Sequence, residues 1–298
     1  MRMRDTLARL PRTDTEQARF DVIDAEIDWI ARGLGARGVH YPALIGRSAL
    51  ERAGYPESFP HLLLSASRSD CSSTAWCLSP AVCYHVYEQF AGQALTEPLA
   101  LTARGLCFRG EQGTAPGIRQ IEFEMREIVF LGPSDWVLAQ SRAAVDRLTT
   151  LAGRLGLCGE WQPAEDPFFL PAAAGKALMQ RLLGVKEEYR SGGPDGLALA
   201  SVNRHGTFFG DRFGIGLADG SAVHTACVAV GLDRWHALRQ RELTGERENG
   251  RTGETKMGLR PARRSRRPEE HDVPYTPSAA APRFARRVPT GIQNHEPG

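Results

Sequence analysis

The stretch Cys107-Phe-Arg-Gly-Glu111, continued beyond a loop by Arg119-Gln-Ile-Glu-Phe123 and Arg126-Glu127, carries the pattern from which we predict the fold. The loop, residues 110–117, is rich in glycine and proline, and apolar residues alternate with charged ones beyond it. This pattern predicts two strands over residues 106–131, and paired strands place alternate side chains on one face. A face with guanidinium groups, carboxylates and an aromatic ring can bind ATP, whereas a surface hairpin with solvated charges is the competing interpretation.

Further helices and strands are predicted on both sides of this stretch. Helices are predicted where apolar residues recur at helical spacing, at residues 14–33, 135–156 and 173–183. Strands are predicted where the sequence is rich in apolar and aromatic residues, at residues 198–202, 207–215 and 226–230. The last of these strands runs through a glycine into an amphipathic helix over residues 232–241.

The size and charge of the chain limit its class. With 298 residues, of which 42% are hydrophobic, the chain can bury one sizeable core. The formal net charge is +2, and the region after Gln240 holds twelve Lys or Arg against eight Asp or Glu, so the preceding residues are slightly acidic. Proteins that grip long nucleic acids present basic surfaces, so this charge balance disfavours tRNA as a partner.

The two ends of the chain differ in composition from the middle. Residues 1–12 do not form a signal peptide, and no run approaches the ~20 apolar residues of a membrane span, so we expect a cytoplasmic protein that does not enter a membrane. Residues 245–298 combine Pro, Gly, Arg and Glu with few large apolar groups, which predicts a disordered basic tail. The arginines of residues 263–267 either contact nucleic acid or a membrane, or are simply solvated.

Two further segments carry chemically useful side chains. Residues 224–235 predict an apolar strand, a glycine turn and a helix whose first turn holds Arg234. This arginine either reaches a phosphate above the sheet or is an exposed side chain on an ordinary turn. Cys83 follows a proline turn, and the six cysteines of the chain are spread too widely for a disulfide framework. They are therefore metal ligands or buried thiols.

In their order along the chain, these segments resemble the catalytic domain of class II aminoacyl-tRNA synthetases, in particular seryl-tRNA synthetases of the zinc-dependent archaeal kind. Phe108-Arg-Gly-Glu111 resembles the F-R-x-E of motif 2, residues 119–127 its returning strand, and Gly231-Leu-Asp-Arg234 the G-x-x-R of motif 3. Residues 53–60 would end motif 1. The resemblance implies an α+β fold in which helices flank an antiparallel β-sheet. It also implies a catalytic domain over residues 51–244, after an N-terminal helical segment, residues 1–50, and before the tail, residues 245–298.

The resemblance also implies a zinc site. Ordinary bacterial seryl enzymes grip the substrate amino group with a P-T-x-E stretch, whereas this chain reads Pro80-Ala-Val-Cys83. The same replacement of an acid by a thiol occurs in the zinc-dependent relatives. Carried over by position, the zinc ligands would be Cys83, Glu127 and Cys227, with Cys77 as the competing first ligand. Three protein ligands and one open position are typical of a catalytic zinc site.

The remaining site residues are also implied by the resemblance. Arg109 and Arg234 would be the catalytic residues that clamp the phosphates of ATP as an aminoacyl adenylate forms. The other expected ATP-binding residues are Glu111, Arg119 and Phe123. ATP would enter with magnesium, but Leu199-Ala-Ser stands where relatives usually have Glu-Ser-Ser, so we assign no magnesium ligand. Two short segments fall on the substrate side in relatives, Asp166-Pro-Phe-Phe169 and Asn203-Arg-His205, and from them we take Asp166 and Asn203 as substrate-binding candidates.

The segment before the synthetase-like catalytic domain bears on which acceptor receives the amino acid. Seryl-tRNA synthetases carry a long N-terminal arm that grips tRNA, and the match here starts near residue 54, so we expect no tRNA partner. The chain most resembles a truncated bacterial family, the amino acid:[carrier protein] ligases, which load glycine or alanine on the phosphopantetheine thiol of a small acidic carrier protein. Motif 1 implies a homodimer. The alternatives are transfer to another acceptor, or a non-catalytic paralogue that binds an amino acid or nucleotide.

Overall fold

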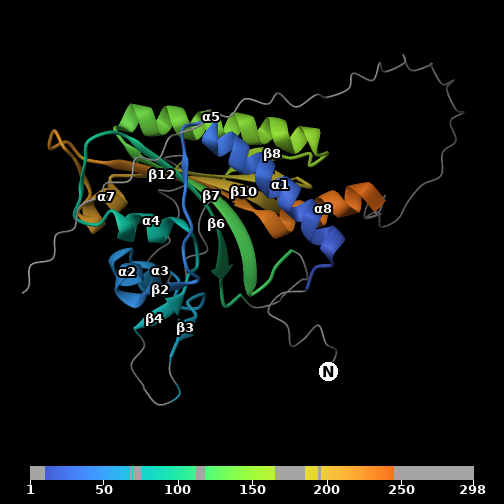
Figure 1. The fold of residues 1–298 in the computed structure, drawn as a ribbon, viewed down its shortest axis with the longest axis horizontal. Coiled ribbons are helices and arrows are strands. Elements are labelled where there is room, and N and C mark those ends of the chain that lie inside the picture. The colour runs from blue at the N-terminus through green and yellow to red at the C-terminus, as the bar shows by residue number, and fades with distance from the viewer. Residues whose placement is uncertain are drawn as a thin grey trace, which may run out of the picture. The chain divides into compact units, whose positions relative to one another are not determined.

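The computed structural model describes residues 11–67, 69, 75–111, 118–164, 185–193 and 196–244. A seven-stranded sheet with the order β1-β6-β7-β12-β10-β9-β8 forms the centre of this part of the chain (Figure 1). In that order the strands are β1 (Arg37–Gly38), β6 (Leu99–Phe108), β7 (Glu122–Gly132), β12 (His224–Gly231), β10 (Leu197–Gly206), β9 (Lys186–Ser191) and β8 (Glu160–Pro163). Only the short edge strand β1 runs parallel to its neighbour among these pairs.

Three helices pack against one face of the sheet, namely α1 (Asp14–Arg32), α5 (Ser134–Arg154) and α8 (Leu232–Thr244). Because side chains alternate along β7, Ile128 and Phe130 point into this layer, where they meet Phe20 and Ile27 of α1 and Leu148 of α5. Thr13 and Glu16 form a capping box that fixes the start of α1. The apolar stripe of α1 thus belongs to the same core as the sheet.

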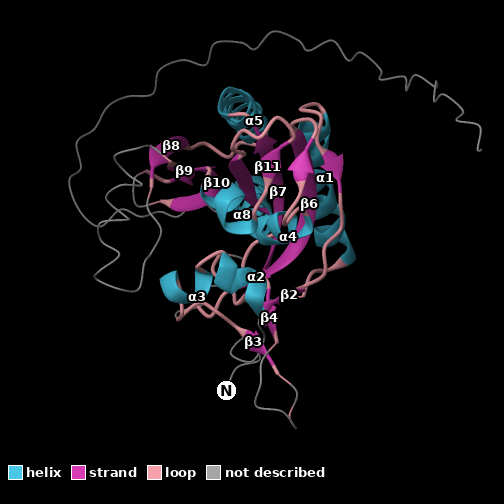
Figure 2. Ribbon diagram, turned by 90° about the vertical axis from the view of Figure 1, so that its left-hand side faces the viewer, coloured by secondary structure: helices cyan, strands magenta, loops and turns pink. Residues whose placement is uncertain are grey.

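The opposite face of the sheet carries smaller elements (Figure 2). Its helices are α2 (Arg47–Arg52), α3 (Tyr55–Ser58), α4 (Cys83–Gln89) and α7 (Phe208–Phe213). A three-stranded sheet joins β2 (Leu44–Gly46), β4 (Trp76–Leu78) and β3 (Ser65–Ala66), and a two-stranded one joins β5 (Ala94–Leu95) with β11 (Gly216–Leu217). The predicted α+β fold, an antiparallel sheet flanked by helices, is confirmed.

The prediction of a strand over residues 207–215 is wrong, because these residues form helix α7. Strand β10 ends at Gly206, and Gly214 caps the end of α7; the two glycines have φ angles of 57° and 64°. Left-handed backbone of this kind favours glycine and breaks a strand. Phe209 and Phe213, four residues apart, share one face of α7 and pack against Tyr87 of α4. Aromatic residues favour strands only as a weak tendency, and this packing overrides it.

Other sequence predictions fall on elements of the structure or outside the described residues. The strands predicted within residues 106–131 correspond to the end of β6 and to β7, and the helices predicted at residues 14–33, 135–156 and 232–241 correspond to α1, α5 and α8. The helix at residues 173–183 and the tail, residues 245–298, lie outside the described residues. The domain boundaries after residues 50 and 244 stay predictions. No helix in the described ranges has the length and apolar character that crossing a bilayer requires.

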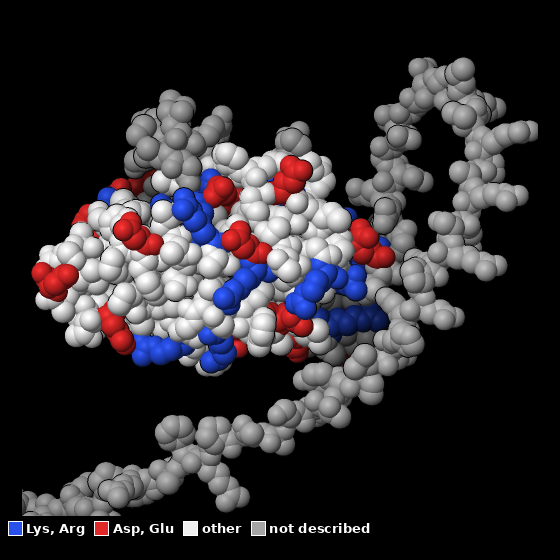
Figure 3. Space-filling model, turned by 90° about the horizontal axis from the view of Figure 1, so that it is seen from above, with Lys and Arg blue, Asp and Glu red and all other residues white. Residues whose placement is uncertain are grey.

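The face of the molecule that carries α5 shows no patch of a single charge sign. Acidic and basic side chains are interspersed over it (Figure 3). A protein that neutralises the phosphates of a long nucleic acid needs a cluster of cations on the contact face. The visible part of this face does not present one.

A buried ion pair joins α1 to the sheet. Arg126 of β7 makes two hydrogen bonds to the carboxylate of Asp24, with N–O distances of 2.5 and 2.9 Å, and a third of 2.8 Å to Asp28. The side chains of Arg126 and Asp24 are each only 11% exposed. This fork-to-carboxylate geometry makes up for some of the cost of removing both charges from water.

We expect Asp24→Ala to lower the free energy of unfolding by about 3 kcal/mol, because it leaves a buried guanidinium without its main partner. Chemical denaturation followed by circular dichroism measures this change. Glu26→Ala, also on α1, is the control, since it removes an exposed ion pair with Arg154 of α5 and should cost less than about 1 kcal/mol. Equal losses in the two variants would contradict a special role for the buried pair.

Candidate active site

A pocket of about 1170 Å³ opens on the sheet face that carries α4 and α7. Elements far apart in the sequence contribute to it, including α3, β7, β10, β12 and the first turn of α8. The structure brings nine of the ten predicted site residues to its wall: Cys83, Arg109, Glu111, Arg119, Phe123, Glu127, Asn203, Cys227 and Arg234. The tenth, Asp166, lies outside the described residues.

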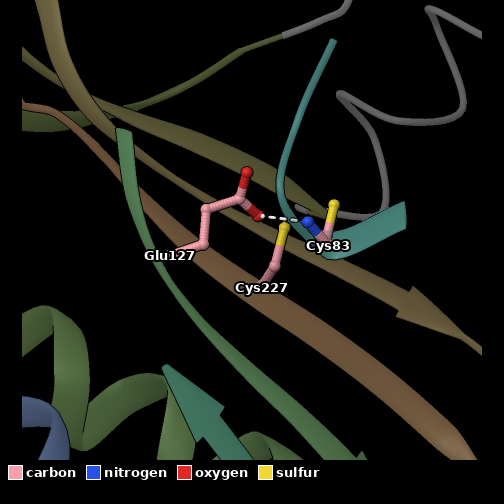
Figure 4. Close-up of side chains that lie close together, drawn as sticks. All are labelled: Cys83, Glu127 and Cys227. Atoms are coloured by element: carbon pink, nitrogen blue, oxygen red, sulfur yellow. Dashed lines mark hydrogen bonds between the residues drawn. The ribbon is translucent and has the colours of Figure 1, made fainter. Parts of the chain in front are cut away.

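Three of these residues, Cys83, Glu127 and Cys227, converge at the floor of the pocket (Figure 4). One ligand atom of each lies within 4.8 Å of the others, and all three residues are buried. In the ladder between β7 and β12, Cys227 faces Val129 while Glu127 faces Ala229, so the two functional side chains are diagonal neighbours on one face. Cys83 reaches them from the start of α4. Local spacing in the sequence does not reveal this cluster, because only the sheet register creates it.

The carboxylate of Glu127 is fixed by the first backbone groups of α4. Its Oε1 accepts a hydrogen bond from the N–H of Val82 at 2.8 Å, and its Oε2 accepts one from the N–H of Cys83 at 3.2 Å. The first N–H groups of a helix have no partner within the helix, so a carboxylate there is well placed. These two bonds tie α4 to β7 and orient Glu127 towards the thiols.

Burial and mutual repulsion shift the protonation of this cluster. Removal from water, and then the negative charge of Cys227, raise the pKa of Glu127 to about 8. A hydrogen bond from Cys83 to Cys227 lowers the pKa of Cys227 and raises that of Cys83. Without a cation the three groups therefore share protons rather than carrying three negative charges. Two sulfur atoms and a carboxylate oxygen form a donor set that suits a zinc ion, with room for a fourth ligand from the pocket side.

Cys77, the alternative first ligand, lies elsewhere. It sits on β4 in a separate apolar cluster with Ile45, Leu50 and Tyr55, and it is fully buried there. Within the described part of the chain, the group able to hold a metal consists of Cys83, Glu127 and Cys227. The geometry therefore favours Cys83 over Cys77.

Arg109 lines the same pocket, beside Phe123. It follows the last residue of β6, and its backbone N–H donates to the carbonyl of Ile121 at 2.9 Å, which closes the two strands at that end. Its Nε donates to the carbonyl of Pro80 at 3.2 Å, and its guanidinium carbon lies 5.2 Å from the centre of the Phe123 ring. These two contacts hold the guanidinium group of Arg109 in place from two sides.

A second group of charged side chains lies near Arg109. Arg234, on the first turn of α8, donates from Nε to the carbonyl of Ile118 and from Nη1 to that of Ala198, each at 2.8 Å. Burial, and then the positive charge of Arg109, lower the pKa of Arg234. Glu111 forms an ion pair with Arg119 at 3.2 Å. The pocket therefore has a cationic side suited to phosphates.

An aromatic wall on the other side of the cluster is formed by Tyr87, His205 and Phe209; the resemblance pointed to His205, in the segment 203–205, but sequence reasoning missed Tyr87 and Phe209. His205 Nδ1 lies 3.4 Å from the hydroxyl of Tyr87 and 3.3 Å from that of Thr225, and its Nε2 lies 4.0 Å from the sulfur of Cys227. The ring of Phe209 stacks on Tyr87 at 4.3 Å and meets His205 edge-on at 4.7 Å. The helical spacing of Cys83 and Tyr87 is a local signal for part of this wall. Phe209 was missed because residues 207–215 were predicted to form a strand.

Comparison with characterised proteins gives two groups of sequence relatives, and no family model matches the chain. Amino acid–[acyl-carrier-protein] ligases 2 and 1 of Bradyrhizobium diazoefficiens are 34% and 33% identical over 224 and 231 residues. The first alignment covers 66% of this chain and 66% of the relative, and the second covers 68% and 70%. The type-2 serine–tRNA ligase of Methanocaldococcus jannaschii is 29% identical over 174 residues, which are 53% of this chain and 32% of that protein. The chain thus spans about two thirds of the length of the two bacterial relatives.

Solved structures with the same fold include class II aminoacyl-tRNA synthetases. The SerRS of M. kandleri, in a complex with A. aeolicus tRNASec, superposes with a TM-score of 0.65 at 20% identity, covering 76% of this chain and 52% of that one. Giardia lamblia prolyl-tRNA synthetase in complex with prolyl-adenylate gives a TM-score of 0.58 at 16% identity, covering 72% and 45%. At such identities the likeness establishes the fold, and function depends on the site.

Proposed function

The chain belongs to the amino acid–[acyl-carrier-protein] ligases, and on that premise we propose that it activates a small amino acid with ATP and loads it on the phosphopantetheine thiol of a carrier protein. The observation that carries the proposal is the pocket itself. It combines a buried donor set, Cys83, Glu127 and Cys227, with the guanidinium groups of Arg109 and Arg234. An amine-binding group beside phosphate-binding groups fits the formation of an aminoacyl adenylate.

In the first step, a carboxylate oxygen of the amino acid would attack the α-phosphorus of ATP, and the bond to the leaving pyrophosphate would break. Arg109 would bind the α-phosphate, where negative charge grows during attack, because its position is fixed before substrate arrives. Arg234 and Arg119 would hold the departing phosphates. The ring of Phe123 would stack on the adenine, and the carboxylate of Glu111 would accept a hydrogen bond from the adenine amino group. ATP would enter with magnesium.

The amino group of the substrate would be held at the donor set. Cys83, Glu127 and Cys227 would hold zinc, which when bound would accept the amino group as the free base and so select α-amino acids. The two backbone N–H groups on Glu127 hold this carboxylate in place, and Asn203 donates to the sulfur of Cys227 at 3.7 Å. The side chains therefore keep one arrangement before substrate binds.

The sheet order gives the direction of the substrate side chain. Two of the three donors, Glu127 and Cys227, lie on β7 and β12, and Arg109 lies beyond β7 at the end of β6. With the amino group at the donor set and the carboxylate turned towards Arg109, the side chain must point to the other side, towards β10 and α7. There it meets His205 and Phe209, whose contacts with Tyr87 leave them little freedom to move. This wall supports glycine or alanine as the substrate.

We expect Phe209→Leu to widen the range of amino acids. The ratio of kcat/KM for valine over that for alanine should rise about tenfold, because a hydrophobic wall discriminates by a factor of this order per added group. Pyrophosphate exchange with each amino acid measures the ratio. Phe213→Leu is the matched control, since Phe213 also packs on Tyr87 from α7 but does not line the pocket, and it should leave the ratio unchanged. An unchanged ratio in Phe209→Leu would exclude this side chain as a determinant.

In the second step the carrier's thiolate would attack the carbonyl carbon of the adenylate, forming a thioester and releasing AMP. The slightly acidic body of the chain does not favour tRNA as an alternative acceptor.

A homodimer, a cytoplasmic location and a catalytic domain over residues 51–244 complete the proposal. A role of the basic tail in docking an acidic carrier is testable by deleting residues 245–298 and measuring the KM for carrier.

The deciding experiment is amino-acid-dependent exchange of labelled pyrophosphate into ATP, scanned over the twenty amino acids, together with the zinc content of the purified protein. Mass spectrometry of a phosphopantetheinylated carrier protein then detects loading. Exchange with one or two small amino acids and a thioester on the carrier would support the proposal. Exchange without loading would indicate another acceptor, and no exchange with any amino acid would indicate a non-catalytic paralogue.

A further inference from the structure

Arg12, which precedes α1, reaches the back of the pocket wall. Its side chain is 10% exposed, and its guanidinium carbon lies 3.6 Å above the ring of Phe20. One of its nitrogen atoms binds Glu124 at 2.9 Å and the other binds Asp233 at 2.5 Å. A residue near one end of the described chain thus bridges two acids that are more than a hundred positions apart in sequence.

These two acids are the immediate neighbours of predicted ATP-binding residues. Glu124 follows Phe123 on β7, and Asp233 precedes Arg234 on α8. The backbone N–H of Glu124 donates to Asp233 Oδ2 at 2.6 Å, so the carboxylate of Asp233 joins the start of β7 to the first turn of α8. Both acids also line the pocket. The relative position of Phe123 and Arg234 therefore depends on this junction.

The junction also concentrates negative charge beside the proposed ATP site. The carboxylates of Asp233 and Glu124 both line the pocket, and without a cation beside them they would repel a triphosphate in its low-dielectric wall. Arg12 binds both, and Arg104 of β6 binds Glu124 from a third direction at 2.5 Å. Removing Arg12 would take away the positive charge that this ion pair places beside the carboxylate of Asp233.

We propose that Arg12 is a positioning residue of the ATP site, which locks Asp233 and Glu124 so that Arg234 and Phe123 face the nucleotide, and which neutralises the two acids behind them. This inference rests on the proposed function, because it assumes that ATP occupies the pocket. It assigns a role in nucleotide binding to the segment before α1.

The test compares Arg12→Met and Arg12→Lys with the wild type in pyrophosphate exchange. We expect Arg12→Met to raise the KM for ATP about tenfold and to leave the KM for the amino acid within about twofold, since misplacement of binding groups weakens only the interactions they make. Arg12→Lys keeps the charge without the two-pronged geometry, and it should recover part of the affinity. Binding of a non-hydrolysable ATP analogue, measured by calorimetry, should show the same order.

Asp24→Ala is the matched control for a purely structural effect. It breaks another buried ion pair between α1 and β7, but Asp24 does not line the pocket. This variant should lose stability while its KM for ATP stays at the wild-type value. A wild-type KM in Arg12→Met, or an equal rise in Asp24→Ala, would overturn the proposal. A wild type that binds the ATP analogue but shows no exchange would refute the proposed catalysis alone, and the analogue affinities would still decide the role of Arg12.

Discussion

Arg109→Ala is expected to lower the rate of amino-acid-dependent pyrophosphate exchange by about 10³-fold, because it removes a preorganised donor from the phosphate at which charge develops. The side chain is partly buried between Phe123 and the carbonyl of Pro80, and it lines the same pocket as the donor set. Water admitted to its place cannot supply a fixed positive charge. The effect should appear mainly in kcat, since the interaction strengthens as the transition state forms.

Two further variants make this result interpretable. Arg109→Lys retains a positive charge but not the planar fork, and we expect it to recover only a small part of the rate. Arg154→Ala, at an exposed site on α5, should leave the rate unchanged. Thermal unfolding of all three variants checks that each is folded. Exchange by Arg109→Ala within about tenfold of the wild type would show that the transferring phosphate lies elsewhere in the pocket.

If the proposed site holds zinc, Cys227→Ala is expected to abolish zinc binding and, with it, the proposed amino acid activation. Loss of one of three protein ligands leaves two, and exchange should fall by at least about 100-fold. Elemental analysis of the purified variant gives a readout independent of activity, with zinc falling from about one per chain to a small fraction. Cys83→Ala should behave in the same way.

Two other cysteines of the described chain provide controls. Cys158→Ser changes an exposed thiol, and Cys77→Ala changes the thiol that sequence comparison offered as a competing ligand. Both variants should retain zinc, although Cys77→Ala should lose some stability because its thiol is packed in a core. Loss of zinc in Cys77→Ala but not in Cys83→Ala would show that Cys77, and not Cys83, is the first zinc ligand.

Much of the fold was accessible from the sequence because local patterns signal it. The two strands around the motif 2 resemblance and the strand-to-helix turn at Arg234 follow from alternation and from a glycine that ends a strand. The helix α7 did not, because Phe208 and Phe209 favour a strand by propensity, and the packing of Phe209 on Tyr87 is a contact between distant segments. Propensity has no information about such contacts.

The residues of the candidate site also differ in whether the sequence could predict them. The residues on motif-like segments were identifiable by resemblance, and the structure places those that it describes around one pocket. The positions of His205 and Phe209 depend on how β10 and α7 pack over α4, and the reach of Arg12 to Asp233 depends on where α1 lies on the sheet. These relations join segments with no common spacing, so the sequence contains no local signal for them.

The hydrogen bonds from the start of α4 to Glu127 connect the proposed metal site to the thermal stability of the protein. A cation held by Cys83, Glu127 and Cys227 would tie α4, β7 and β12 together, and it would bind the folded chain in preference to the unfolded one. Free zinc at 100 times its dissociation constant would then add about 2.7 kcal/mol to the free energy of unfolding. The melting temperature would thus rise with zinc concentration, which makes the heat resistance of the protein a measure of its metal supply.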